Sequence, residues 1–112
     1  MFDYNIEYRK NILFIRLIGS LNYNNVVSLD NELENIINKM GIKCIVFNFE
    51  QLKSIDTNSI QVLIKWYSLI KRRKGVSYIC GVRGKLRIDS LLSNMCEVSN
   101  ELSAIRVINW NN

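Results

Sequence analysis

The chain has 112 residues, a formal net charge of +5 at pH 7 and a hydrophobic share of 48%. This length and composition indicate one folded domain over residues 1–112 and exclude a disordered chain. With no histidine and only three widely spaced cysteines, the sequence offers no Ser/His or Cys/His catalytic pair, no paired zinc-ligand spacing and no disulfide framework. Cys44 and Cys80 lie within apolar runs and are expected to be buried as small hydrophobic side chains.

Further classes of protein are excluded by missing patterns. No apolar run approaches the roughly 20 residues that cross a bilayer, and residues 1–4 lack the basic start and apolar block of a signal peptide. The glycine pair in Gly81-Val82-Arg83-Gly84 matches no nucleotide-binding signature. We therefore expect a cytoplasmic, non-enzymatic protein without a metal or cofactor.

The first two predicted elements are strands. Apolar and polar residues alternate from Phe2 to Arg9, a period of two that is typical of a half-buried strand. Lys10-Asn11 suits a tight turn, and Ile12–Ile18 forms a second strand, which Leu21 and Tyr23 extend. Strands so close in sequence are expected to pair as an antiparallel hairpin.

A helix follows, then a central strand. Apolar residues recur at helical spacing at Val26, Leu29, Leu33, Ile36, Ile37 and Met40. Asn24 or Asn25 is expected to cap this helix, and Gly41 to end it. The nearly continuous apolar run Cys44–Phe49 predicts a strand that is covered on both faces.

The second helix is expected over about residues 57–74. Its main apolar stripe comprises Ile60, Leu63, Ile64, Tyr67 and Ile70. A second stripe of Val62, Trp66 and Leu69 indicates either core packing or a partner surface. The run Lys71-Arg72-Arg73-Lys74 favours charge complementation at the helix C-terminus over nucleic-acid binding.

The remaining elements complete an α/β pattern. Val76–Gly81 predicts a strand, Ala104–Ile108 the last strand, and a third helix is expected to begin near Arg83 or Gly84, with its apolar stripe at Ile88, Leu91, Leu92 and Met95. The predicted order is β-β-α-β-α-β-α-β, in a mixed, mostly parallel sheet with an N-terminal antiparallel strand and helices packed on it.

The stretch Ile42–Leu63 carries a resemblance. A buried strand and a short connection lead to Asp56-Thr57-Asn58-Ser59-Ile60-Gln61 at the start of the second helix. This arrangement resembles the STAS domain of bacterial anti-sigma factor antagonists, whose motif at this place is close to Asp-Ser-Ser/Thr-Gly-Leu-Gly. The order of elements over residues 2–108 is similar as well.

The resemblance implies a regulated protein-binding site. The family residue after the aspartate is phosphorylated by the cognate anti-sigma factor, a protein kinase, and here that position is Thr57. The implied partner-binding residues are Asp56, Thr57, Asn58, Ser59, Gln61, Lys85, Arg87 and Asp89. Ser59 and Gln61 replace the two glycines of the motif and partly fill the space by which a partner approaches. The C-terminal helix of typical members is expected to be missing after a last strand at residues 104–108.

Several alternatives stay open on the residues alone. Asp56 or Thr57 can serve simply as a helix N-cap, and Ser54 or Ser59 are competing acceptors for a phosphate. The family also includes accessory subunits of bacterial lipid-transport ABC complexes, which bind the transporter ATPase, and scaffolds of STAS signalling assemblies, which form homo-oligomers. No binding of nucleic acid and no direct insertion into a membrane is expected.

Overall fold

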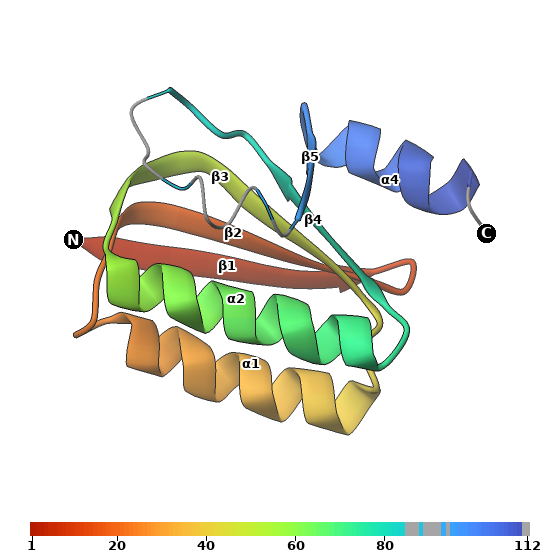
Figure 1. Cartoon of the computed structure of the whole chain (residues 1–112), viewed down its shortest axis with the longest axis horizontal. Helices are drawn as coiled ribbons and strands as arrows, with labels where there is room; N and C mark the ends of the chain where they lie inside the picture. The colour runs from red at the N-terminus through yellow and green to blue at the C-terminus, as the bar shows by residue number, and fades with distance from the viewer. Residues whose placement is uncertain (85–87, 89–92, 94, 111–112) are drawn as a thin grey trace.

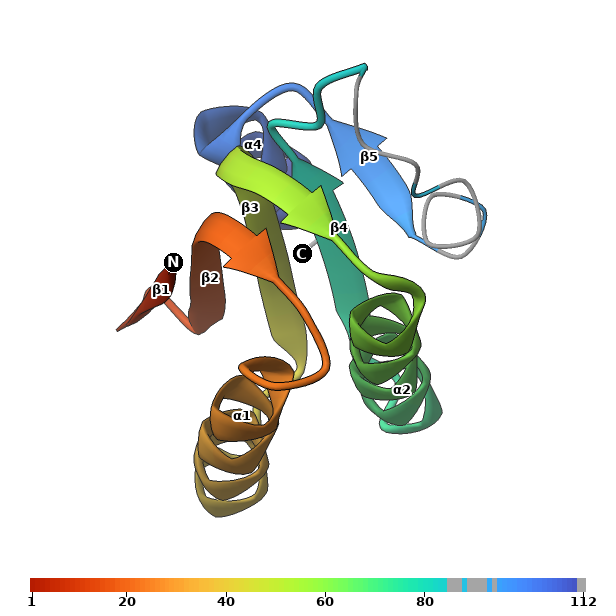
Figure 2. The same ribbon diagram turned by 90° about the vertical axis from the view of Figure 1, so that its left-hand side faces the viewer.

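The computed structural model describes residues 1–84, 88, 93 and 95–110. These residues form an α/β domain around a five-stranded sheet with the order β1-β2-β3-β4-β5. Figures 1 and 2 show α1 and α2 together on one face of the sheet and α4 on the opposite face. The predicted α/β class and the mixed sheet are confirmed.

The N-terminal hairpin forms as the alternation predicts. Strands β1 (Phe2–Arg9) and β2 (Ile12–Leu21) pair antiparallel in an uninterrupted register that ends at Arg9 and Ile12. Lys10 and Asn11 both have positive φ, at 53° and 67°. This is the two-residue turn whose twist matches that of the flanking strands. Tyr23 lies outside the strand that it was expected to extend.

The rest of the sheet is parallel. Strand β2 pairs with β3 (Cys44–Ile55), β3 with β4 (Val76–Cys80), and β4 with β5 (Cys96–Val98). Helices α1 (Val26–Met40) and α2 (Thr57–Arg72) are the crossovers. The predicted end of β3 at Phe49 was wrong: the strand continues to Ile55 because its polar second half still pairs with β2, through two register shifts.

The main core lies between the sheet and the pair α1 and α2. Trp66 belongs to it, with only 3% of its surface exposed, and Val62 and Leu69 pack partly buried against it. The Trp66 indole N–H donates to Asp30 Oδ1 at 2.7 Å, and Lys65 Nζ lies 2.7 Å from the same oxygen. A tryptophan whose apolar body is buried and whose polar tip is bonded is a core residue.

Arg73, just after the C-terminal end of α2, makes structural contacts with α1. The Arg73 guanidinium donates to Asn38 Oδ1 at 2.8 Å and to the Ile37 carbonyl at 3.5 Å, so it joins α2 to the end of α1. The helix ends at Arg72 rather than Lys74, and Lys74 adopts a left-handed conformation with φ 62°. Gly41 ends α1 as predicted, in the left-handed conformation.

The prediction of a last strand at Ala104–Ile108 was wrong. These residues lie within α4 (Glu101–Trp110), and the last strand is β5. Asn100 begins the helix, because its side-chain oxygen accepts from the Ser103 amide at 2.8 Å. The C-terminal helix that was expected to be missing is therefore present. The third predicted helix lies mostly outside the described residues, although Ile88 and Met95 of its stripe are buried.

Helix α4 covers a second, smaller apolar cluster on the other face of the sheet. Ala104 and Ile108, one turn apart, pack with Phe14, Val46 and other residues of the strands. Cys80 is fully buried in this cluster, as predicted, and burial raises the pKa of its thiol to about 12. Cys44 is half-buried beside it rather than enclosed.

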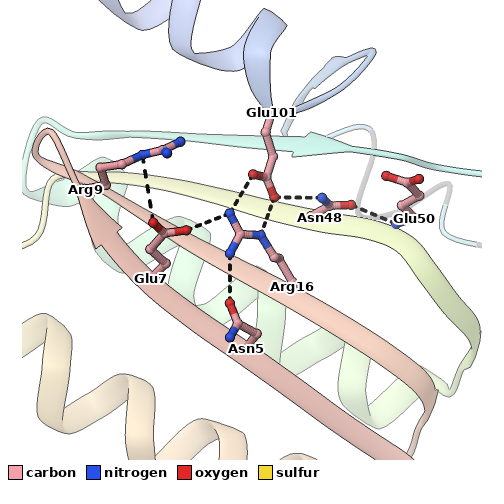
Figure 3. A network of polar contacts seen from close by, with 7 residues as sticks. All are labelled: Asn5, Glu7, Arg9, Arg16, Asn48, Glu50 and Glu101. Atoms are coloured by element: carbon pink, nitrogen blue, oxygen red, sulfur yellow. Dashed lines mark hydrogen bonds and ion pairs between the residues drawn. The ribbon is translucent and has the colours of Figure 1, made fainter.

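A polar network holds α4 in place (Figure 3). Arg16 on β2 donates two hydrogen bonds to the Glu101 carboxylate, from Nε at 2.7 Å and from Nη2 at 2.8 Å. Asn48 on β3 donates to Glu101 Oε2 at 2.8 Å, and Arg16 also reaches Asn5 and Glu7 on β1 at 2.8 and 2.9 Å. One guanidinium thus joins β1, β2 and α4.

Replacing Glu101 tests this anchor. We expect Glu101→Gln to lower the free energy of unfolding by about 1–2 kcal/mol, because Arg16 loses its charged, bidentate acceptor in a partly buried place. Urea denaturation at neutral pH measures the change. Glu97→Gln, at an exposed site on β5, is the control and should change the value by less than about 0.5 kcal/mol. Equal losses for the two variants would contradict the assignment.

The same anchor predicts a pH dependence. The hydrogen bonds from Arg16 lower the pKa of Glu101 and outweigh the opposing effect of burial. A carboxyl whose pKa is lower in the folded state stabilises the protein above its unfolded pKa, about 4.3, and loses this contribution as the pH falls through the folded pKa. The advantage of wild type over Glu101→Gln should therefore be complete at neutral pH and disappear in acid, as followed by urea titrations over pH. An advantage that grows in acid would contradict this.

Candidate functional site

The candidate site lies where β3 ends and α2 begins. The Asp56 amide donates to the Leu21 carbonyl at 3.1 Å and thereby continues the pairing of β3 with β2. Asp56 is extended, with φ −91° and ψ 170°, and its Oδ1 accepts from the Ser59 amide at 2.8 Å. Asp56 is therefore the N-cap of α2, as one of the two sequence interpretations predicted.

The second carboxylate oxygen of Asp56 makes a long-range contact. Oδ2 accepts a hydrogen bond of 2.8 Å from the backbone amide of Tyr23, in the loop between β2 and α1. Desolvation raises the pKa of Asp56, but the hydrogen bonds from Ser59 and Tyr23 outweigh it, so the net pKa lies below the ordinary value. The carboxylate stays ionised at neutral pH and fixes two segments to each other.

Asparagines give the loop between β2 and α1 its shape. Asn22 Oδ1 accepts from the amides of Asn24 and Asn25 at 2.9 and 3.2 Å. Asn25 Oδ1 accepts from the Asn22 amide at 2.8 Å, and Asn25 Nδ2 donates to the Ser20 carbonyl at 2.9 Å. Asn25 precedes α1 but makes no side-chain cap bond, because its side chain is used within the loop.

The first turn of α2 presents some of the predicted residues and buries one. Thr57, Asn58 and Gln61 are exposed, whereas Ser59 is fully buried. Within the described structure the amides of Thr57 and Asn58 donate no hydrogen bond. Unpaired amides at the positive end of a helix dipole are suited to an anion.

The competing hydroxyls differ in access. Thr57 is exposed at the first helical position, and Ser54 is exposed on β3. Burial removes the Ser59 side chain from the surface on which a partner or a kinase would act. Lys85, Arg87 and Asp89 lie outside the described residues.

Two exposed apolar residues at this site are not among those that the sequence predicted. Tyr23, whose amide bonds to Asp56, has 62% of its surface exposed, and Val27, in the first turn of α1, has 54% exposed. The positions of these two residues beside the site follow from the register of β2 with β3, which brings the end of β2 to the start of α2. Apolar side chains beside exposed amides are common in protein-binding surfaces.

A surface hollow of about 1040 Å³ opens at the end of the sheet where β2 and β3 finish. Its lining includes Ser20, Glu50, Lys53 and Arg83, from the ends of β2 and β3 and from the segment after β4. Because both cations are exposed, they add positive charge to this end of the molecule. Among residues 1–84, 88, 93 and 95–110, no cluster of cysteine and carboxylate side chains suits a metal ion.

Comparison with known sequences identifies the family. A sequence model described as the STAS domain matches residues 3–104. The chain therefore belongs to the STAS domain family, as the junction at Asp56 and the order of elements predicted. No helix in the described part of the chain combines the length and apolar character needed to cross a membrane.

Three solved proteins of similar structure show the same fold. The anti-sigma factor antagonist SpoIIAA in its unphosphorylated form is 16% identical with a TM-score of 0.81, covering 96% of this chain and 98% of that one. The phosphorylated form of SpoIIAA from Bacillus is 17% identical to this chain with a TM-score of 0.76, and the match covers 94% of this chain and 99% of that one. A serine-to-glutamate variant of RsbS from Moorella thermoacetica is 17% identical with a TM-score of 0.79, and the match covers 95% of this chain and 94% of that one. A chain of the stressosome, a signal integration and transduction hub, is 16% identical with a TM-score of 0.69, and the match covers 94% of this chain and 96% of that one.

The two bonds to Asp56 predict a stability order. We expect Asp56→Ala to lower the free energy of unfolding by about 1–2 kcal/mol, because the α2 cap and the tie to Tyr23 are both lost. Asp56→Asn should lose less, since its amide oxygen still accepts from Ser59. Urea denaturation measures the three proteins, with Thr57→Ala as the exposed control. A loss for Thr57→Ala as large as that for Asp56→Ala would contradict the assignment.

Proposed function

We propose that this protein is a cytoplasmic protein-binding regulator of the anti-sigma factor antagonist type. It binds an anti-sigma factor, a serine/threonine kinase, through the first turn of α2. The observation that carries the proposal is the exposed Thr57 at the start of a helix that Asp56 fixes in place. Asn58, Gln61 and the exposed Tyr23 extend the contact surface.

Phosphorylation of Thr57 switches this contact. The phosphate accepts hydrogen bonds from the amides that α2 leaves unpaired, so the fold tolerates the modification. It also adds about −1.5 to −2 charges to the surface at neutral pH. A partner shaped for the neutral hydroxyl then meets a desolvated charge without a counterion, and its affinity falls.

The comparisons support this mechanism by analogy. SpoIIAA is an anti-sigma factor antagonist that has been solved both without and with phosphate. The RsbS variant carries glutamate in place of a serine, which adds a negative charge. In the present chain, Thr57 is the exposed hydroxyl residue of the corresponding helix turn, since Ser59 is buried.

A charge at Thr57 tests the switch. Thr57→Asp should weaken binding to the cognate kinase about 100-fold, equivalent to about 3 kcal/mol, because it places a carboxylate in the interface. Ser54→Asp is the matched control, since it makes the same charge change at an exposed position on β3 and should leave binding within about threefold. Calorimetry or surface plasmon resonance gives the Kd values.

Incubation with kinase and ATP tests the modification itself. Wild type and Ser54→Ala should take up one phosphate, and Thr57→Ala none, as measured by mass spectrometry. Phosphate on Thr57→Ala, or equal loss of binding by Thr57→Asp and Ser54→Asp, would refute the switch. Capture of a transporter ATPase in place of a kinase would instead support the role of an accessory subunit.

The similarity to the stressosome chain favours one second candidate. A scaffold within a STAS signalling assembly would form a stable, large homo-oligomer. Light scattering distinguishes the two roles: a large particle supports the scaffold, whereas a monomer or dimer supports the regulator.

A further inference from the structure

The outer edge of β1 lies apart from the α2 site, at the opposite side of β2 from β3. In the described part of the chain, β1 is the first strand of the sheet and pairs on one side only, with β2. The Ser20 amide donates to the Met1 carbonyl at 3.0 Å, which makes the odd-numbered residues of β1 those that bond to β2. The amides and carbonyls of Phe2, Tyr4, Ile6 and Tyr8 therefore point to the open edge.

The side chains of β1 divide between the two faces of the sheet. Phe2, Tyr4 and Ile6 pack partly buried against the core under α1 and α2. The odd-numbered side chains lie on the opposite face, where Glu7 and Asn5 contact Arg16. Asp3 and Arg9 stand near the two ends of this row, with opposite charges.

We propose that this edge pairs with β1 of a second copy of the chain. The two strands run antiparallel about a two-fold axis at Ile6, and the two sheets become one continuous sheet. Asp3 of each copy then lies opposite Arg9 of the other, and Tyr4 lies opposite Tyr8. The pairing satisfies the outward amides and carbonyls of Tyr4, Ile6 and Tyr8 in both copies.

Charge selects this register. In an antiparallel pair, residues directly opposite each other have their side chains on the same face of the sheet. A two-fold axis perpendicular to the sheet therefore passes through a residue position of β1, and only a few registers are allowed. An axis at Asn5 gives similar overlap but places Asp3 opposite Glu7, which sets like charges against each other twice. The axis at Ile6 gives two attractive pairs instead.

Both charged side chains are available for the new contact. Arg9 Nε lies 4.0 Å from Glu7 Oε2, at the outer limit of an ion pair, and the Arg9 side chain is 49% exposed. Asp3 Oδ1 accepts from the Tyr4 amide at 2.8 Å, so in a single copy it satisfies one of the outward donors itself. On pairing, that amide passes to the second strand and the Asp3 carboxylate to Arg9. Asp3 and Arg9 fall at a pair without mutual backbone bonds, where side chains approach most closely.

Charge exchange tests the proposal. Asp3→Arg sets two arginines against each other in both pairs, and Arg9→Asp sets two aspartates against each other, so each variant alone should dimerise about tenfold more weakly than wild type. In an equimolar mixture, each pair of the mixed dimer joins an arginine to an aspartate, because one variant carries arginine at positions 3 and 9 and the other carries aspartate at both.

The pairing at each end decides the result of mixing. One end of the mixed dimer joins the substituted position 3 of one copy to the substituted position 9 of the other, which is an attractive arginine–aspartate pair. The other end joins the unchanged Asp3 to the unchanged Arg9, which is attractive as well. The mixture should therefore regain the wild-type dimer. Lys10→Asp makes the same charge change as Arg9→Asp but lies in the turn, and it should keep the wild-type affinity. Sedimentation equilibrium over a concentration series gives the dissociation constants.

Ile6→Pro provides an independent test. The Ile6 amide points to the open edge, a position at which proline is tolerated in an edge strand. The variant should stay folded by circular dichroism but lose the dimer, because the two central backbone bonds cannot form. A wild type that remains monomeric at every concentration, or a charge-matched mixture that binds no better than either variant alone, would overturn the proposal. Its failure would leave the Thr57 switch untouched, since that switch is measured by kinase binding.

Discussion

The parallel pairing of β2 with β3 is the constraint from which the candidate site follows. It continues to Leu21 and Ile55, at the ends of both strands, and the Asp56 amide then bonds to Leu21. Two chain segments that are more than thirty residues apart thus leave the sheet side by side. Only because of this does one carboxylate reach both the Ser59 amide of its own helix and the Tyr23 amide of the other segment. The exposed turn of α2 is therefore held by the sheet rather than by the helix alone.

Patterns of spacing predicted the elements whose apolar face is regular. The alternation in β1 and the helical recurrence in α1 and α2 each have one dominant period, and these elements were found. Ala104–Ile108 failed because the run is rich in β-branched residues, which favour strands, whereas Ala104 and Ile108 are spaced four apart and pack as one helical face. Asn100, a good N-cap, was the local signal for that helix. The second half of β3 was missed since its polar side chains carry no strand period, and backbone pairing with β2 keeps it extended.

The candidate site was predictable to a different extent. Asp56 as a cap and Thr57 as an exposed hydroxyl follow from local chemistry at the start of a helix. The bond from Tyr23 to Asp56 depends on the register between β2 and β3, with its two irregularities, and nothing in the local sequence encodes that register. The burial of Ser59 shows the same limit: it stands next to Ile60, and the way α2 packs against the sheet turns both residues inward.

The docking of α4 has a consequence for the order in which the chain folds. The apolar residues that it covers, Phe14 and Val46 among them, come from strands made early in synthesis. One acceptor for Arg16, Glu101, comes 85 residues later. Because α4 follows these strands in the chain, the apolar residues that it covers leave the ribosome before the helix does. Exposed apolar sheet surface is the form in which nascent chains associate wrongly. Arg16 on this face already has Glu7 of β1 as one carboxylate partner, at 2.9 Å, and gains the Glu101 carboxylate only when α4 docks.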